Sequence, residues 1–269
     1  MFDKLNDFQN RAPGSVAVIT IPNNRTLDKL HISLPVGMSK SQITRIEGKI
    51  QDRRFFVDTG ALGAAKDSYL NSFAGYVDPQ VITIDFTEPN ARGGAPEMYL
   101  TSVPVNLCGK VTFEVTIDPS VTVAQAAAIT ASHEFRAPTA NPFILNRKDS
   151  TLSMPFTGDN DIILPSGRSG GLIKRMWIHQ GNGNITGIEL RGDNKTLHRW
   201  TDMALLAYSE KRNGMVPQPN MIALDFVDAG NTMQAVNTMG YTETLLRVTV
   251  SAPDTGRAYV DFVKQFSAV

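Results

Sequence analysis

Residues 16–22 read Val-Ala-Val-Ile-Thr-Ile-Pro, and this run sets the pattern for the whole chain. Side chains branched at Cβ are crowded in a helix but fit the pleated surface of a sheet. Alternate residues of a strand point to opposite faces, and Pro22 ends the run because it has no N–H to donate to a ladder. The segment therefore predicts a β-strand over 16–21.

Runs of the same kind recur along the chain, separated by turn residues. They predict further strands at 29–34, 43–50, 81–86, 111–117, 172–179, 221–226 and 245–250. Only two stretches have helical spacing, at 58–70 and 201–212. The pattern is that of a mainly β chain with short helices in two long connections.

The second half of the chain repeats the first half in the same order. Six short segments have a later partner, and the spacing between partners changes only gradually. The pairs are Ile19–Pro22 with Ile162–Pro165, Ile43–Glu47 with Ile185–Glu189, Arg54–Phe55 with Arg199–Trp200, Ile84–Phe86 with Leu224–Phe226, Val115–Ile117 with Val248–Val250, and Ile129–Phe135 with Val260–Phe266. We infer that one β-sandwich plan is present twice. General similarity between β-rich sequences is the alternative.

The repeat predicts an N-terminal arm (residues 1–12) and two domains, 13–136 and 137–269. Seven or eight short strands with long cross-connections cannot form a simple meander, so each domain is predicted to be an eight-stranded jelly-roll β-sandwich. The alanine-rich segment 123–135 has helical propensity. Its repeat partner is strand-like, and a strand is therefore predicted there.

The balance of charge excludes several classes of function. The 269 residues carry 26 basic and 26 acidic side chains, whereas a protein that coats nucleic acid has a basic excess.

The single cysteine, Cys108, cannot form an internal disulfide. The start of the chain lacks the apolar core of a signal peptide, and no run reaches the ~18 apolar residues of a membrane span. We expect synthesis in a cytosol.

Catalytic motifs are weak. Residues 167–171 read Gly-Arg-Ser-Gly-Gly and approach the G-x-S-x-G motif of hydrolases, but that motif requires a helix after the elbow, and here a strand is predicted. The four histidines, His31, His133, His179 and His198, include no His-x-His pair of the kind a metal-dependent double-barrel enzyme needs. We expect a glycine-rich turn and structural or surface histidines.

Three further motifs have a structural interpretation beside a functional one. Gly181-x-Gly183 lacks the third glycine of a dinucleotide-binding loop and predicts a hairpin. Residues 159–161 (Asp-Asn-Asp) could offer oxygen atoms to calcium but lack the rest of a calcium loop, so a solvated turn is predicted. Residues 53–56 (Arg-Arg-Phe-Phe) could stack on single-stranded nucleic acid, but one such cluster on a neutral chain is more typical of a strand entering the core.

The N-terminal segment carries apolar residues at a spacing of three. Phe2, Leu5 and Phe8 predict an apolar stripe on a short helix that ends before Pro13. A helix this short is unstable alone and needs a surface to dock on. That surface is either a partner or the chain's own first sandwich, and the sequence leaves both open.

Tandem sandwiches, a helix in an equivalent connection of each, and a docking arm together resemble the double jelly-roll major capsid proteins of tail-less, membrane-containing icosahedral bacteriophages. Within that group the chain is most similar to the corticovirus type. The resemblance covers nearly the whole chain and is carried by Gly14–Pro22, Ser41–Arg53, Arg147–Pro165, Gly170–Asp193 and Leu245–Phe266. The loops around 91–95 and 228–240 do not match.

This resemblance implies a structural protein of the virion capsid and not an enzyme. It implies a homotrimer in which six similar barrels surround one axis and form a pseudo-hexagonal capsomer, which tiles an icosahedral shell over an internal membrane. The implied partners are neighbouring capsomers, vertex and minor capsid proteins, and the membrane, with Phe2, Leu5 and Phe8 as inner-face anchors. Direct nucleic-acid binding is not expected. No cofactor is implied, although structural calcium is possible by the resemblance, with no residue assigned to it.

Two other classes of function are alternatives. A β-sandwich carbohydrate-binding protein would place exposed aromatic side chains such as Trp177, Trp200 or Tyr208 on one face. A two-barrel enzyme would cluster its histidines in the fold.

Overall fold

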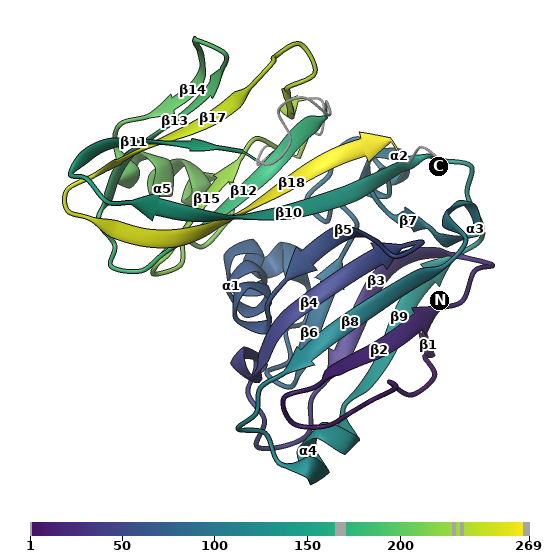
Figure 1. Cartoon of the computed structure of the whole chain (residues 1–269). Coiled ribbons are helices and arrows are strands. Elements are labelled where there is room, and N and C mark those ends of the chain that lie inside the picture. Colours follow the sequence, from purple (N-terminus) through teal and green to yellow (C-terminus); the bar gives the residue numbers. More distant parts are fainter. Residues whose placement is uncertain (1, 165–170, 228–229, 232–233, 266–269) are drawn as a thin grey trace. The chain divides into compact units, whose positions relative to one another are not determined.

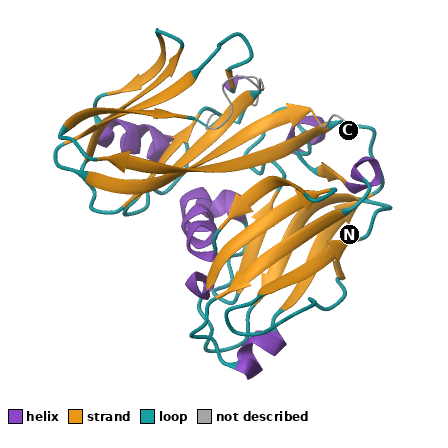
Figure 2. Ribbon diagram, viewed as in Figure 1, coloured by secondary structure: helices purple, strands orange, loops and turns teal. Residues whose placement is uncertain are grey.

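The computed structural model describes residues 2–164, 171–227, 230–231 and 234–265. Within these ranges the chain forms two compact units (Figure 1). The first comprises the chain as far as Arg147 together with Gln265, and the second runs from Lys148 to Lys264. In each unit the strands form two antiparallel sheets, with short helices in the connections (Figure 2).

The first unit is built from strands β1 to β9. One sheet has the order β2-β8-β4-β5, and the other has the order β1-β9-β3-β6, with β7 also paired to β3. The strands are β1 (Phe2–Lys4), β2 (Val16–Ile21), β3 (Thr26–Ser33), β4 (Ile43–Ile50), β5 (Arg53–Asp58), β6 (Val81–Asp85), β7 (Val103–Pro104), β8 (Val111–Ile117) and β9 (Thr130–Arg136). The helices are α1 (Gly60–Leu70), α2 (Ala95–Met98), α3 (Val105–Cys108) and α4 (Val123–Ala128), with 3₁₀ turns at Lys40–Gln42 and Asn71–Ala74.

The second unit uses strands β10 to β18, and the first residues of β10, as far as Arg147, belong to the first unit. Its sheets have the orders β11-β17-β13-β14 and β10-β18-β12-β15, with β16 also paired to β12. The strands are β10 (Phe143–Met154), β11 (Gly158–Ile163), β12 (Leu172–Gln180), β13 (Ile185–Gly192), β14 (Lys195–Trp200), β15 (Met221–Asp225), β16 (Val236–Asn237), β17 (Thr244–Val250) and β18 (Asp254–Gln265). The helix α5 (Met203–Arg212) follows β14.

The two units share one connectivity, strand for strand. When the eight main strands of each unit are counted in chain order, without β7 and β16, one sheet has the order 1-8-3-6 and the other 2-7-4-5. This is the jelly-roll arrangement of two packed antiparallel sheets. The helices α1 and α5 both follow the fifth strand. The predicted duplication and the predicted pair of eight-stranded jelly rolls are confirmed.

Irregularities in the ladders are duplicated too. The register of β3 with β9 shifts between Leu27 and Lys29, and that of β12 with β18 shifts between Ile173 and Arg175. The pairs β4–β8 and β13–β17 share a second shift near their starts, and β4–β5 and β13–β14 share a third. Because a bulge bends and twists its strand, the two units have local backbone geometry in common as well as strand order.

Each unit has its own apolar core, built by alternation along the strands. From Phe113 to Ile117 in β8, buried apolar residues alternate with partly exposed polar ones, and β17 repeats this alternation from Leu246 to Val250. A period of two places one face of each strand in the core. For this reason the strands predicted from alternation are found as β2, β3, β4, β6, β8, β12, β15 and β17.

Both predicted helices are confirmed, and each begins at a side-chain cap. The hydroxyl oxygen of Thr59 accepts a hydrogen bond from the backbone N–H of Leu62, and the carboxylate of Asp202 accepts from the N–H groups of Ala204 and Leu205. Such caps satisfy N–H groups that have no partner within the helix. The sequence therefore determines locally where each long connection becomes helical.

The prediction of one strand over 123–135 is wrong. This segment divides into α4 and β9. Thr122 and Gln125 form a capping box, in which each side chain bonds the other's backbone N–H, and this box starts the helix. Alanine propensity was the better guide here, because the strand character of the repeat partner extends only over the part that becomes β9.

The prediction of an N-terminal helix is also wrong. Residues Phe2–Lys4 form β1, which pairs with β9, so the segment predicted as a separate arm contains the first strand of the first jelly roll. Leu5 and Phe8 are buried in the first core. A helix of this length is barely stable, whereas strand pairing satisfies the backbone directly. The domain boundaries at 12/13 and 136/137 stay predictions.

Candidate functional site

The candidate catalytic motif has the wrong local structure after it. Residues 167–170 lie outside the described residues, and β12 begins at Leu172, where the hydrolase motif requires a helix. Cys108 is fully buried, and burial raises the pKa of its thiol to about 12. At neutral pH this cysteine is protonated and inaccessible, and it therefore cannot act as a nucleophile.

The histidines of the first unit are engaged in structural hydrogen bonds. His31 lies 3.0 Å from the hydroxyl of Thr83 through Nδ1 and 3.1 Å from the Glu134 carboxylate through Nε2. His133 donates from Nδ1 to the carbonyl oxygen of Asp3 and accepts from the Arg25 guanidinium at Nε2. Burial lowers the pKa of both rings, so they are neutral at pH 7.

In the second unit, His198 stacks on Trp200 at 5.6 Å between ring centroids, and burial lowers the pKa of its imidazole. His179 is the eighth residue of β12, paired with Met221 of β15 and Arg257 of β18. Nowhere in the described ranges do three or more His, Cys, Asp or Glu side chains gather as a potential metal site.

The predicted solvated turn at 159–161 is wrong, because these residues lie in β11. The guanidinium of Arg247 donates two hydrogen bonds to Asp161, at 2.7 and 2.8 Å, and the hydroxyl of Thr249 donates to Asp159 at 2.7 Å. The hydrogen bond from Arg247 lowers the pKa of Asp161. A calcium ion would have to displace an arginine that already neutralises this carboxylate.

The interpretation of residues 53–56 as a strand entering the core is confirmed, whereas the predicted hairpin at 181–183 is wrong, because the strands on either side of it, β12 and β13, belong to different sheets. Phe55 and Phe56 are buried in β5, while Arg54 at the strand's outer side pairs with Glu47 at 3.3 Å. The glycines 181 and 183 lie in the connection between β12 and β13. There the Asp254 carboxylate accepts the backbone N–H of Asn182 at 3.2 Å, so this loop is held by its own chain.

The three predicted anchor residues of the N-terminal segment differ in their exposure. Phe2 is 66% exposed, with its ring 5.8 Å from that of His31, whereas Leu5 and Phe8 are 5% and 4% exposed. Beyond Phe8, Gln9 forms an isolated antiparallel bridge with Val18 of β2. Of the three, only Phe2 is available to a partner in this structure.

Exposed apolar side chains mark further surfaces that sequence reasoning missed. The most exposed, each at least 64% accessible, are Phe2, Val36, Tyr76, Val123, Phe156, Ile163, Leu205, Tyr208 and Met239. Phe156 precedes β11 and Ile163 is the last residue of that strand. Leu205 and Tyr208 lie one turn apart on α5. The sequence could have predicted that Ile163 is exposed, because it lies on the same strand face as two aspartates, Asp159 and Asp161.

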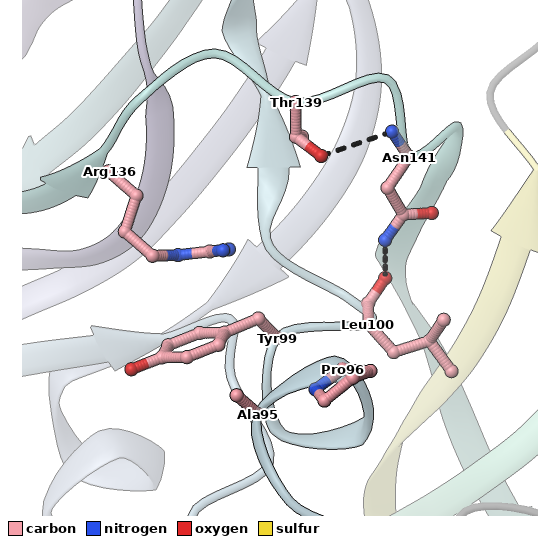
Figure 3. Close-up of a pocket in the computed structure, with 7 residues that line it drawn as sticks. All are labelled: Ala95, Pro96, Tyr99, Leu100, Arg136, Thr139 and Asn141. Atoms are coloured by element: carbon pink, nitrogen blue, oxygen red, sulfur yellow. Dashed lines mark hydrogen bonds between the residues drawn. The ribbon is translucent and has the colours of Figure 1, made fainter.

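A pocket of about 490 Å³ lies in the first unit around α2 (Figure 3). The guanidinium of Arg136 stacks over the ring of Tyr99, 3.8 Å from its centroid, while its Nε–H donates to the Asp28 carboxylate. The amide of Asn141 fixes the other wall by donating to the carbonyl oxygen of Leu100 at 2.8 Å. The pocket is mostly apolar with one cationic edge.

The second unit has a pocket of about 260 Å³ between β14 and α5, lined in part by Trp200 and Leu205. The aromatic face expected of a carbohydrate-binding protein is not assembled. Trp177 is 2% exposed and its indole N–H donates to Asp261 at 2.8 Å, whereas Tyr208 is 64% exposed on α5. Among the described residues no helix combines the length and apolar character needed to cross a bilayer.

The fold defines the chain as a double jelly-roll protein of the kind found in viral capsids. It superposes on the major capsid protein P2 from bacteriophage PM2 with a TM-score of 0.85 at 17% identity, over 99% of this chain and 98% of the other. The major capsid protein of Sulfolobus turreted icosahedral virus (STIV) gives 0.69 at 12% identity, covering 98% and 96%. VP54 of PBCV-1 gives 0.64 at 9% identity, covering 100% and 96%.

Sequence comparison then identifies the family. The profile of the viral coat protein P2 N-terminal domain matches residues 2–136, and that of the C-terminal domain matches residues 144–266. The chain belongs to the viral coat protein P2 family, as the resemblance predicted. Comparison with individual curated proteins gives no match. Membership of a coat protein family places the chain in the virion capsid.

Proposed function

We propose that this chain is the major capsid subunit of an icosahedral virion and forms homotrimers that act as pseudo-hexagonal capsomers. The observation that carries the proposal is the shared connectivity of the two units, including the duplicated bulges. Three copies of a chain with two equivalent barrels place six similar barrels around a threefold axis. A closed ring of this kind uses heterologous contacts, and its outline fits a hexagonal lattice.

The proposal assigns a structural role without catalysis. Synthesis takes place in the host cytoplasm, and the partners are neighbouring capsomers, vertex and minor capsid proteins, and an internal membrane, with no direct binding of nucleic acid. Zero formal net charge supports a shell that faces lipid, because contact with the packaged genome would favour a basic surface. The subunit needs no cofactor, and structural calcium is assigned to no residue.

Light scattering coupled to size-exclusion chromatography tests the trimer. The expected species has three times the chain mass of 29.4 kDa, and concentrated samples should show hexagonally packed sheets or shells in the electron microscope. A monomer that persists at every concentration would contradict the proposal.

Of the three predicted inner-face anchors, only Phe2 can contact the membrane, because Leu5 and Phe8 belong to the core. Phe2→Ser should leave the trimer intact and reduce flotation with phospholipid vesicles. Tyr76→Ser removes a still more exposed aromatic ring (89%) from the same unit and is the matched control. Equal flotation of wild type and Phe2→Ser would remove the anchoring role while leaving the capsid role in place.

A further inference from the structure

The second strand of each jelly roll lies at the edge of its four-stranded sheet, so among the described strands β2 and β11 each have a neighbour on one side only. In an antiparallel ladder, every second residue directs its N–H and C=O toward the paired strand, and the residues between direct theirs away. These two edges are equivalent positions in one fold. They differ in what covers them.

The edge of the first unit is covered by the chain itself. The N–H of Ile117 in β8 donates to the carbonyl oxygen of Ser15. Because successive residues of β2 direct their backbone groups alternately toward and away from β8, the N–H and C=O of Val18 point away from β8. Val18 exchanges two backbone hydrogen bonds with Gln9, at 2.9 and 3.0 Å. An extended segment of this chain therefore fits an edge of this geometry.

Among the residues that the structure describes, nothing pairs with the equivalent edge of the second unit. The N–H of Leu164 donates to the carbonyl of Thr244 at 3.0 Å, so the backbone groups of Asp159, Asp161 and Ile163 point away from β17. Asp161 holds the position that Val18 holds in β2. In the described parts of the chain, none of these three residues makes a backbone hydrogen bond on the open side.

β11 also lacks the usual protection of an edge strand, which is a bulge, a proline or an outward lysine. Its register with β17 is regular from Gly158 to Ile163, and none of these residues is Pro or Lys. The carboxylates of Asp159 and Asp161 are held by Thr249 and Arg247 of β17, so they do not guard the edge as free charges.

Apolar side chains stand at both ends of this edge. Phe156 precedes β11 and is 72% exposed, and Ile163 ends the strand at 65%. Edge pairing supplies backbone hydrogen bonds, and side chains at its margins supply the apolar contact that makes an interface stable.

We propose that the open edge of β11 is an assembly interface, where an extended segment of a second copy of this chain adds as a strand between Phe156 and Ile163. The inference rests on the proposed function, because it requires self-association. Two observations select another copy as the occupant. The chain belongs to a coat protein family, and the equivalent edge in the first unit already accepts an extended segment of the same chain.

Amide hydrogen exchange tests the pairing directly. In dissociated subunits the amides of Asp159, Asp161 and Ile163 should exchange fast, and in the assembled protein they should become protected. The peptide that contains Val18 is the internal control, because that amide is hydrogen-bonded to Gln9 within one chain. Unchanged exchange at all three β11 amides on assembly would overturn the proposal.

A proline scan provides the second test. Ile163→Pro removes an outward N–H without removing a bond to β17, so the subunit should fold while its association weakens at least about tenfold, as expected for loss of a hydrogen bond in an interface. Thr20→Pro is the matched variant at the equivalent position of β2 and should associate as wild type does.

The outcomes separate the two claims. A wild-type protein that never associates contradicts the proposed function. Wild type that assembles, with Ile163→Pro assembling equally well, overturns the β11 interface and leaves the capsid role standing. Equal loss of assembly in Ile163→Pro and Thr20→Pro also overturns it, because the effect would then belong to neither edge in particular.

Discussion

The two jelly rolls have the same connectivity and the same bulges, yet equivalent positions carry different chemistry. In the first unit Lys29 and Asp85 form an ion pair at 3.5 Å, with side chains 25% and 20% exposed. In the second unit Arg175 and Asp225 hold the same places in β12 and β15, at 2.6 Å and 5% and 1% exposed. Both copies have an ion pair at this position, and its burial differs between them.

The cores differ in the same way. Four phenylalanines, Phe55, Phe56, Phe86 and Phe113, contact one another in the first unit, with centroids 5.3–6.3 Å apart. In the second unit His198 and Phe226 hold the places of Phe56 and Phe86, with ring centroids 4.9 Å apart, and Trp200 packs 5.7 Å from Phe226. Alternation determines which positions face inward, and many side-chain sets of suitable volume can fill them.

The largest expected effect concerns the buried ion pair. Asp225→Asn should lower the free energy of unfolding of the second unit by about 3–5 kcal/mol, because it removes the negative charge that lies 2.6 Å from the buried guanidinium of Arg175. Asp85→Asn, the matched change in the first unit, should cost at most about 1 kcal/mol. Amide hydrogen exchange in urea reports each unit separately, and tryptophan fluorescence reports the second unit independently, since Trp177 and Trp200 both lie there. Equal costs in both units would contradict the comparison.

The next effect concerns the third duplicated bulge, where Gly48 and Leu190 are equivalent. A Cβ at Gly48 would lie 2.9 Å from ring atoms of both Phe113 and Phe55, so Gly48→Ala should destabilise the first unit by about 1–3 kcal/mol through overpacking. Leu190→Ala should destabilise the second unit by about 2–5 kcal/mol through a cavity. Thermal unfolding measures both, and a stabilising Gly48→Ala would show that the rings yield freely.

Acid should weaken the first unit. The folded-state pKa of His31 and His133 lies below the usual 6.5 because both rings are buried. The folded state therefore binds fewer protons than the unfolded state, and stability present above about pH 6.5 is lost as the pH falls. Protonation of His133 at Nε2 also sets it against Arg25. His133→Gln should flatten the dependence of the melting temperature on pH, and an unchanged slope would contradict this assignment.

The smallest expected effect is the loss of an exposed ion pair, and its cost in unfolding free energy should be equal in the two units. Arg54 pairs with Glu47, and Arg199 pairs with Glu189, at 3.3 and 3.4 Å, and the two arginine side chains are 42% and 64% exposed. Exposed ion pairs contribute at most about 1 kcal/mol because water and salt screen them. Arg54→Ala and Arg199→Ala should therefore each change the unfolding free energy by less than this, as measured by urea titration. A large loss in either would mean that the arginine has a role beyond the ion pair.

Alternation and repetition were enough to predict the architecture. The run at 16–21 and its later partner near 162 lie in β2 and β11, the same strand of each jelly roll. Such patterns survive because a strand with one buried face must alternate. The helices at 60–70 and 203–212 were predictable for a related reason, since their caps are local.

The N-terminal segment shows what spacing cannot decide. Residues at intervals of three can share one face of a helix, but Phe2 lies on a strand while Leu5 and Phe8 enter the core after it. Pairing of β1 with β9 joins residues about 130 positions apart, and no local pattern records such a contact. The open edge of β11 is hidden for the same reason, because strand order determines which backbone groups find partners.

The central claim is that each chain supplies its two equivalent jelly rolls as two of the six lobes of a trimeric tile. Averaged electron cryomicroscopy images of the assembled protein, viewed down the symmetry axis, test this most directly. The account predicts six lobes of similar size around a threefold axis, with neighbouring lobes alternating between the first and the second unit. A ring with any other number of lobes, or particles built from separated monomers, would contradict it.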